Sequence, residues 1–118
     1  MANPQAQLTN SQVREYAFLE GMYEDDYFPK RCVDMGRDIL VELCADIEQQ
    51  QPRDLDGLYT LCHAATERFN DLEQVFDEEG SELETVAREV IAENFEFIAH
   101  AYGFAEADVE ELIAPREW

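Results

Sequence analysis

Residues 54–79 read DLDGLYTLCHAATERFNDLEQVFDEE and decide the fold. Their apolar side chains recur at alternating spacings of three and four residues, the period of one face of an α-helix. Asp54 is a suitable N-cap, and Gly80 is a suitable stop. The stretch therefore predicts one long helix over about 54–79. Its expected buried stripe is Leu55, Leu58, Cys62, Ala65, Phe69, Leu72 and Phe76.

A second long helix is predicted before this stretch. Pro29 suits the first turn of a helix, where its missing N–H costs no hydrogen bond, and Asp25 and Asp26 precede it as N-caps. The apolar residues that follow repeat at three and four residues until about Gln50. Gly36 lies inside this stripe, which predicts a close crossing with another helix.

A third long helix is predicted after it, ending at about Tyr102. Ser81 to Glu84 has the Ser-x-x-Glu pattern of a capping box, and Gly103 is the expected C-terminal glycine. Asn94 is the one polar residue in its apolar stripe, and we expect it to bond buried backbone groups or to set the helix register. The expected buried side is Leu83, Val86, Ala87, Val90, Ile91, Asn94, Phe97, Ile98 and Ala101.

Shorter segments complete the chain at both ends. Residues 9–11 offer N-caps for a short helix through about Glu20, which Gly21 would end, and a second short helix is expected over about 106–114. Residues 1–8 are polar and expected to be frayed. No segment shows sustained period-two alternation. The predicted fold is all-α: a bundle of three long antiparallel helices with a short helix at each terminus.

Charge is the outlier in the composition. The 118 residues, expected to form a single domain over 1–118, include 28 Asp and Glu against eight Lys and Arg, a net charge of −20. Nucleic acids and anionic membranes need clustered Lys and Arg, so both are excluded as partners. Self-repulsion favours a monomer or at most a weak dimer. The acidic surplus leaves a basic partner, a cation or simple solubility as explanations, and an acid-rich composition with one Lys also suits a high-salt habitat.

The cysteines and the hydropathy indicate a compartment. No N-terminal stretch resembles a signal peptide, and no apolar run approaches the roughly 18 residues of a membrane span. Cys32, Cys44 and Cys62 are odd in number and lie on apolar helix stripes, which indicates free thiols in a reducing environment. We therefore expect a cytoplasmic protein with no membrane association.

Residues 22–30, MYEDDYFPK, place three acids between aromatic side chains, and we name them the acidic-aromatic stretch. In one interpretation the aromatics supply rigid contact area and the carboxylates pair with Arg or Lys of a partner. In the other, the stretch is the approach to a helix, with its aromatics docked on the neighbouring helices. The candidate partner-binding residues here are Tyr23, Glu24, Asp25, Asp26, Tyr27 and Phe28.

A second candidate partner-binding face consists of His63, Glu67 and Asn70, which lie about 100° from the buried stripe of their helix. A histidine oriented by a carboxylate can bind a metal or act as an acid or base, whereas a surface histidine packed on a neighbouring loop gives the same pattern. The sequence has no Cys-x-x-Cys pair, calcium-loop spacing or Gly-rich phosphate loop. No catalytic residue, metal site or cofactor is therefore expected.

Five blocks are distinctive when they are taken together: Glu20–Lys30, His63–Glu67 with Phe69 and Asn70, Glu84–Glu89, Tyr102–Phe104 and Ala114–Trp118. In these blocks the chain resembles an uncharacterised family of small acidic bacterial proteins, a domain of unknown function. The resemblance spans nearly the whole chain and implies a stand-alone cytoplasmic protein. It implies no activity, so no catalytic residue is carried over.

From the charge and the missing catalytic motifs we predict a small, acidic, non-catalytic binding or regulatory protein that recognises a protein partner of basic character. Small acidic helical immunity proteins neutralise basic nuclease toxins in this way, and the comparison is an analogy of charge and size. The alternative is a metal-dependent or acid–base enzyme centred on His63 and Glu67.

Overall fold

A computed structural model describes residues 4–118, and the predicted all-α class is confirmed: this part of the chain contains helices and no strand. Three of the helices are long, as the apolar periods predict. The long helices are α3 (Lys30–Gln50), α4 (Leu55–Glu78) and α5 (Thr85–Ala101). The short elements are the 3-10 helix η1 (Pro4–Gln7), α1 (Ser11–Arg14), α2 (Glu20–Tyr23) and α6 (Val109–Leu112).

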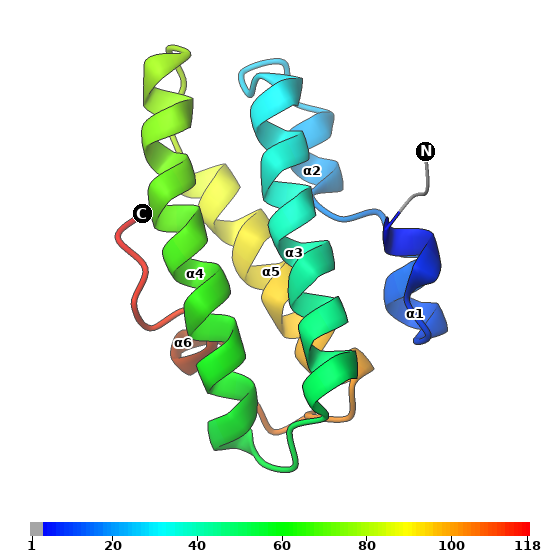
Figure 1. The fold of residues 1–118 in the computed structure, drawn as a ribbon. Coiled ribbons are helices and arrows are strands. Elements are labelled where there is room, and N and C mark those ends of the chain that lie inside the picture. Colours follow the sequence, from blue (N-terminus) through cyan, green and yellow to red (C-terminus); the bar gives the residue numbers. More distant parts are fainter. Residues whose placement is uncertain (1–3) are drawn as a thin grey trace.

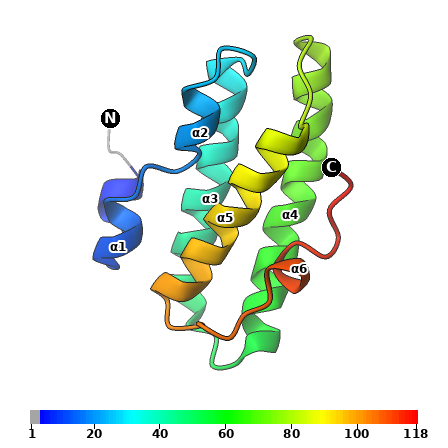
Figure 2. The ribbon, with the colours of Figure 1, turned by 180° about the vertical axis from the view of Figure 1, so that it is seen from behind.

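Helices α3 and α4 lie side by side and form one layer (Figure 1). The short loop 51–54 joins them at one end, so the two helices run in opposite directions. Helix α5 crosses this layer diagonally on one side (Figure 2). In Figure 1 no other helix of the described chain lies over the opposite side of α3 and α4. The α3–α4 layer therefore has one covered face and one bare face.

The helix ends at residues 54, 80 and 103 agree with the sequence predictions. The Asp54 carboxylate caps α4 by accepting a 2.9 Å hydrogen bond from the N–H of Gly57. Gly80 has a φ of 80°, and the next N–H, of Ser81, bonds the carbonyl of Phe76 at 2.9 Å. The same motif closes α5 at Gly103, whose φ is 90°. Only glycine adopts this left-handed turn without strain.

The close helix crossing predicted at Gly36 is confirmed. A Cβ atom at this position would lie 3.0 Å from a methyl carbon of Leu19 and 3.1 Å from the ring of Phe69. The missing side chain therefore lets α3 approach both the N-terminal segment and α4. These contacts lie inside a continuous apolar core, to which all three long helices contribute.

The first helix is much shorter than the predicted span of about 9–20. Asn10 caps α1 as expected, but α1 ends at Arg14, and the chain then turns until Leu19 adopts a φ of 59°. Gly21 lies within α2 and does not end a helix. Phe18 and Leu19 are buried in this turn, so apolar residues continue past Arg14 although the helix does not.

The caps predicted for two helices are wrong. Neither Asp25 nor Asp26 caps α3, because α3 follows Pro29 without a side-chain cap, and the Asp25 carboxylate accepts a 2.9 Å hydrogen bond from the N–H of Tyr27. Ser81 does not open a capping box, because its hydroxyl donates to the carbonyl of Tyr27 at 3.2 Å. Helix α5 begins only at Thr85.

The buried side of α5 is rotated from its predicted position. Val86, expected in the core, is 43% exposed, whereas Phe95 and Ala99 are fully buried although the stripe omitted them. Phe95 packs edge-on against Phe69 of α4 with ring centroids 5.9 Å apart. Helix α5 contacts α2, α3 and α6, and partners on several sides widen its apolar face beyond a single stripe.

The N-terminal segment differs from the frayed segment expected over 1–8. Residues 1–3 lie outside the described residues, but Gln5 and Leu8 are buried. The Gln5 side chain donates to the carbonyls of Val13 and Tyr16, and the Glu48 carboxylate accepts from the N–H of Thr9. Hydrogen bonds of polar side chains hold this segment in place. The spacing of apolar residues in the sequence gives no sign of such bonds.

Candidate functional site

Helix α4 carries a row of polar side chains that hold the C-terminal segment, and this row includes His63 and Asn70. The Nε2 atom of His63 lies 2.6 Å from the carbonyl oxygen of Glu111. The amide of Asn70 donates to the carbonyl of Pro115 at 3.1 Å and accepts from the N–H of Glu117 at 2.8 Å. Both side chains therefore hydrogen-bond the C-terminal segment. This agrees with the interpretation of His63 as a surface histidine that packs on a neighbouring segment.

Tyr59 and Thr66 extend this row on the same side of α4. The Tyr59 hydroxyl accepts from the N–H of Asp108 at 3.1 Å, and the Thr66 hydroxyl lies 3.3 Å from the carbonyl of Leu112. Beyond them the C-terminal residue, Trp118, packs edge-on against Phe69. Glu67 is exposed and has no side-chain partner among residues 4–118, so it does not orient His63.

The acidic-aromatic stretch divides into a buried part and an exposed part. Phe28 is 2% exposed and meets the ring of Phe76 edge-on, at a centroid distance of 6.2 Å. Tyr23 is half-buried and donates its hydroxyl to Asp34 at 2.5 Å. Burial, together with this hydrogen bond, raises the pKa of Tyr23 to about 12. Tyr23 and Phe28 are therefore built into the fold, as the structural interpretation of the stretch expects.

The exposed part of the stretch consists of Glu24, Asp26 and Tyr27, with Asp25 half-buried. Tyr27 is 43% exposed, one of the largest apolar exposures among the described residues. Phe76, which Phe28 contacts, lies 13 residues beyond His63, about 20 Å along the helix axis. The two candidate faces are therefore not brought together into one site.

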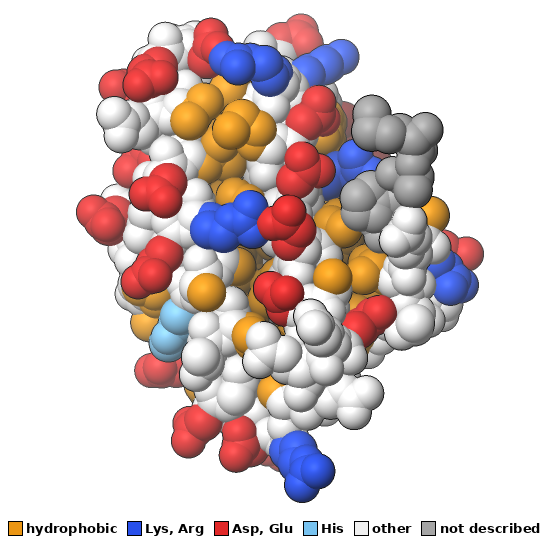
Figure 3. All heavy atoms as spheres, viewed as in Figure 1, with side chains coloured by type: hydrophobic (Ala, Val, Ile, Leu, Met, Phe, Trp, Pro, Cys, Tyr) orange, Lys and Arg blue, Asp and Glu red, His pale blue; other side chains and the backbone are white. Residues whose placement is uncertain are grey.

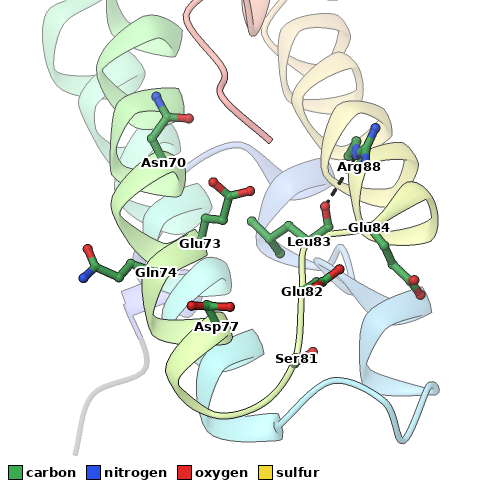
Figure 4. Close-up of a pocket in the computed structure, with 9 residues that line it drawn as sticks. All are labelled: Asn70, Glu73, Gln74, Asp77, Ser81, Glu82, Leu83, Glu84 and Arg88. Carbon is green, nitrogen blue, oxygen red and sulfur yellow. Dashed lines mark hydrogen bonds between the residues drawn. The ribbon is translucent and has the colours of Figure 1, made fainter.

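A pocket of about 620 Å³ lies between α4 and the segment that leads into α5 (Figure 4). Glu73 of α4 and Leu83 of the facing segment both point into the gap between them. Ser81 at its edge bonds the carbonyl of Tyr27, so the pocket adjoins the exposed part of the acidic-aromatic stretch. The lining residues are Asn70, Glu73, Gln74, Asp77, Ser81, Glu82, Leu83, Glu84 and Arg88.

The pocket has a strong acidic bias. Its lining contains four carboxylates, on Glu73, Asp77, Glu82 and Glu84, against the single guanidinium of Arg88. Arg88 directs its Nε atom to the backbone carbonyl of Leu83 at 3.4 Å and has no ion-pair partner among the described residues. The arrangement can accept a cationic group, and Arg side chains suit it because their planar fork can bond two carboxylates.

The sequence predictions missed this pocket for two reasons. Glu73 and Asp77 are four residues apart and share one face of α4, but the same spacing is common on solvated helix surfaces. The capping-box prediction also placed Glu84 inside a helix turn, whereas residues 81–84 are an extended approach to α5. The late start of α5 opens the space that the pocket occupies.

Within residues 4–118, no three or more His, Cys, Asp or Glu side chains are grouped closely enough to hold a metal ion. Cys32, Cys44 and Cys62 are free and buried. Burial raises the pKa of the Cys44 and Cys62 thiols to about 12. No helix of the described chain is long and apolar enough to cross a membrane.

Comparison with protein-family models gives a match over most of the chain. A family model described as a family of unknown function, DUF5713, matches residues 12–118. No curated protein and no solved structure matches the chain. The match begins within α1 and covers α2 to α6 together with the pocket, whereas η1 precedes it.

Proposed function

We propose that this chain, which belongs to the family of unknown function DUF5713, is a non-catalytic cytoplasmic protein that binds a basic protein partner at the acidic pocket beside Tyr27. Helices α3, α4 and α5 serve as the scaffold, a bundle of three long antiparallel helices. Support for that arrangement comes from the short loops that join consecutive helices at alternating ends. The protein acts as a monomer or weak dimer, since a net charge of −20 opposes self-association.

The observation that carries the proposal is the imbalance of charge in a formed pocket. Four acidic residues, from α4 and the facing segment, line a hollow of about 620 Å³ together with a single Arg, although Figure 4 shows the Glu84 side chain directed away from α4. A cationic side chain that enters this pocket meets Glu73 and Asp77 on α4, and the acidic residues of the facing segment add to the negative potential there. Such pairing contributes more to the association rate and to the choice of partner than to the final affinity.

Tyr27 gives the pocket an aromatic neighbour. Its ring packs edge-on against Phe28 at 5.2 Å, so the exposed side chain rests on a buried one. Aromatic residues held in this way supply contact area at low entropic cost, and they are enriched at protein interfaces. Glu24 and Asp26, both exposed, extend the acidic surface on the same stretch.

An enzyme centred on His63 and Glu67 has less support. A ring nitrogen of His63 is bonded to the carbonyl of Glu111, and Glu67 does not contact the ring. The comparison with an immunity protein rests on charge and size, and it predicts that the basic partner is a toxin.

A binding assay with matched charge variants tests the proposal. The probe is a fluorescein-labelled peptide of alternating Arg and Gly, followed by fluorescence anisotropy. The pocket variant carries Glu73→Gln, Asp77→Asn and Glu82→Gln. The control variant carries Glu89→Gln, Glu93→Gln and Glu96→Gln on the exposed side of α5 and has the same net charge.

We expect the pocket variant to bind the peptide about tenfold more weakly than wild type and the control variant to change affinity about twofold or less. Equal losses in the two variants would show that the peptide is attracted only by the overall charge. That result would remove the pocket from the proposal.

A further inference from the structure

We propose that the bare face of the α3–α4 layer is a docking groove for a basic amphipathic helix of about two turns, supplied by another protein. This surface is separate from the acidic pocket and does not depend on the proposed function. On α4, Val75 of the groove is two residues beyond Glu73 of the pocket, a rotation of about 200°. The two surfaces therefore lie on nearly opposite sides of α4.

The groove has an apolar floor and a charged rim. It encloses about 340 Å³ between α3 and α4. Figure 3 shows apolar side chains gathered on this face, with charged side chains around them. Met35 is 40% exposed, and Val75 is half-buried. The floor consists of Met35, Ile39, Leu72 and Val75.

The rim determines the charge of the partner. Asp38 lies on α3 and Asp71 on α4, so each side of the groove has an exposed carboxylate without a side-chain partner among residues 4–118. The rim cation, Arg68, is already paired with Glu42. An apolar stripe with Lys or Arg on both flanks is therefore complementary to the groove. A second copy of this chain would place acidic rims against each other.

The shape of the groove favours a helix. Its floor lies between two helices that α5 already covers from the other side, so a further helix would cover the bare face and form a third layer. Along α3 the groove extends from Met35 to Glu42, eight residues with a rise of about 10 Å. Along α4 it extends over the same number of residues, from Arg68 to Val75. A docked helix would make contact over about two turns, with anchors spaced three and four residues apart.

Three labelled peptides of 18 residues test this proposal with the full chain. The first is a helix with a Leu stripe flanked by Lys, the second has the same composition in scrambled order, and the third replaces Lys with Glu. Met35→Lys is the test variant. Val86→Lys is the matched control, because it adds the same charge at another exposed apolar residue. Val86 is 43% exposed and Met35 is 40% exposed.

We expect the amphipathic Lys peptide to bind wild type at least about tenfold more tightly than the scrambled or Glu peptides. Met35→Lys should lower that affinity about tenfold, whereas Val86→Lys should change it about twofold or less. Met35→Lys and Val86→Lys should bind the Arg–Gly peptide with equal affinity. This comparison separates the effect of Met35→Lys on the groove from any effect on the acidic pocket.

Two results would overturn the proposal. The first is equal binding of the ordered and scrambled Lys peptides, or equal effects of Met35→Lys and Val86→Lys. Either outcome would show that the peptide is attracted by the overall negative charge and not by the groove. The second is a wild-type dimer in sedimentation velocity that Met35→Lys converts to a monomer, because a second copy would then occupy the groove.

Discussion

The backbone N–H of Leu19 donates a 3.0 Å hydrogen bond to the side-chain oxygen of Asn94, 75 residues away along the chain. Leu19 is fully buried in a left-handed conformation with a φ of 59°, so this N–H has no helix partner in the turn before α2. The amide nitrogen of Asn94 is used as well, donating to the carbonyl of Val90 at 2.7 Å. One side chain of α5 therefore holds the turn that sets the direction of the N-terminal segment.

We predict that Asn94→Ala lowers the free energy of unfolding by about 1–3 kcal/mol, because it leaves the buried N–H of Leu19 without a partner. Urea denaturation measures the change. The exposed neighbour Glu93→Ala is the control and should change stability by about 0.5 kcal/mol or less. If both substitutions had the same small effect, the bond between residues 19 and 94 would not stabilise the turn.

The sequence could predict the presence of Asn94 in the core but not its partner. The apolar periods located α3, α4 and α5 to within a few residues, because each buries a stripe over many turns. The N-terminal turns could not be found in this way. They are held by single polar contacts to distant residues, such as those of Asn94 and Glu48, and these contacts leave no periodic signal.

We predict that the contribution of Glu48 to the free energy of unfolding depends on pH. Burial alone would raise the pKa of its carboxyl, but hydrogen bonds from Thr9, Tyr102 and Asn10 outweigh burial and hold the pKa below its ordinary value of 4.5. A lowered folded-state pKa adds stability that is fully present above the unfolded value and is lost as the pH falls through the folded value. Glu48→Gln should therefore lower stability by about 1 kcal/mol at pH 7.

This difference between wild type and Glu48→Gln should shrink as the pH falls below about 4.5. Denaturation at a series of pH values measures it. Asp46→Asn, at an exposed position of the same helix, controls for the loss of one negative charge from a chain of net charge −20. A Glu48→Gln difference that stayed constant from pH 7 to pH 3 would contradict this account.

The three cysteines should be unreactive in the folded protein. Burial raises the pKa of Cys44 and Cys62 to about 12 and also raises the pKa of Cys32, so little thiolate exists at pH 8. We expect an aromatic disulfide reagent to label none of them within minutes under native conditions and all three in denaturant. Rapid native labelling of one thiol would show that its helix opens locally.

Salt should raise the melting temperature. Only three ion pairs, those of Arg31, Arg68 and Arg116, occur among residues 4–118, whereas the chain has 28 acids. Screening of the unpaired carboxylates should raise the melting temperature by several degrees between about 20 and 500 mM NaCl. Potassium chloride should give the same rise, because screening depends on ionic strength. A flat melting temperature would indicate that repulsion contributes little.

The candidate site was only partly predictable. The sequence drew attention to the acidic-aromatic stretch and to the His63 face. It could not show that Phe28 and Tyr23 turn inward or that His63 and Asn70 bond the C-terminal segment, because both depend on which segments meet. The acidic pocket needed the late start of α5 at Thr85, whereas the Ser-x-x-Glu pattern predicts a start near Ser81.

Retention of a partner from native lysate tests the binding proposal most directly. Immobilised wild type, the pocket variant (Glu73→Gln, Asp77→Asn, Glu82→Gln) and the α5 control variant (Glu89→Gln, Glu93→Gln, Glu96→Gln) are compared by mass spectrometry. A fourth protein carries Tyr27→Ala, a substitution at an exposed ring. We predict that wild type and the α5 control retain the same basic protein and that the pocket variant and Tyr27→Ala release it. Equal retention by all four proteins, or retention of no protein by wild type, would contradict the proposal.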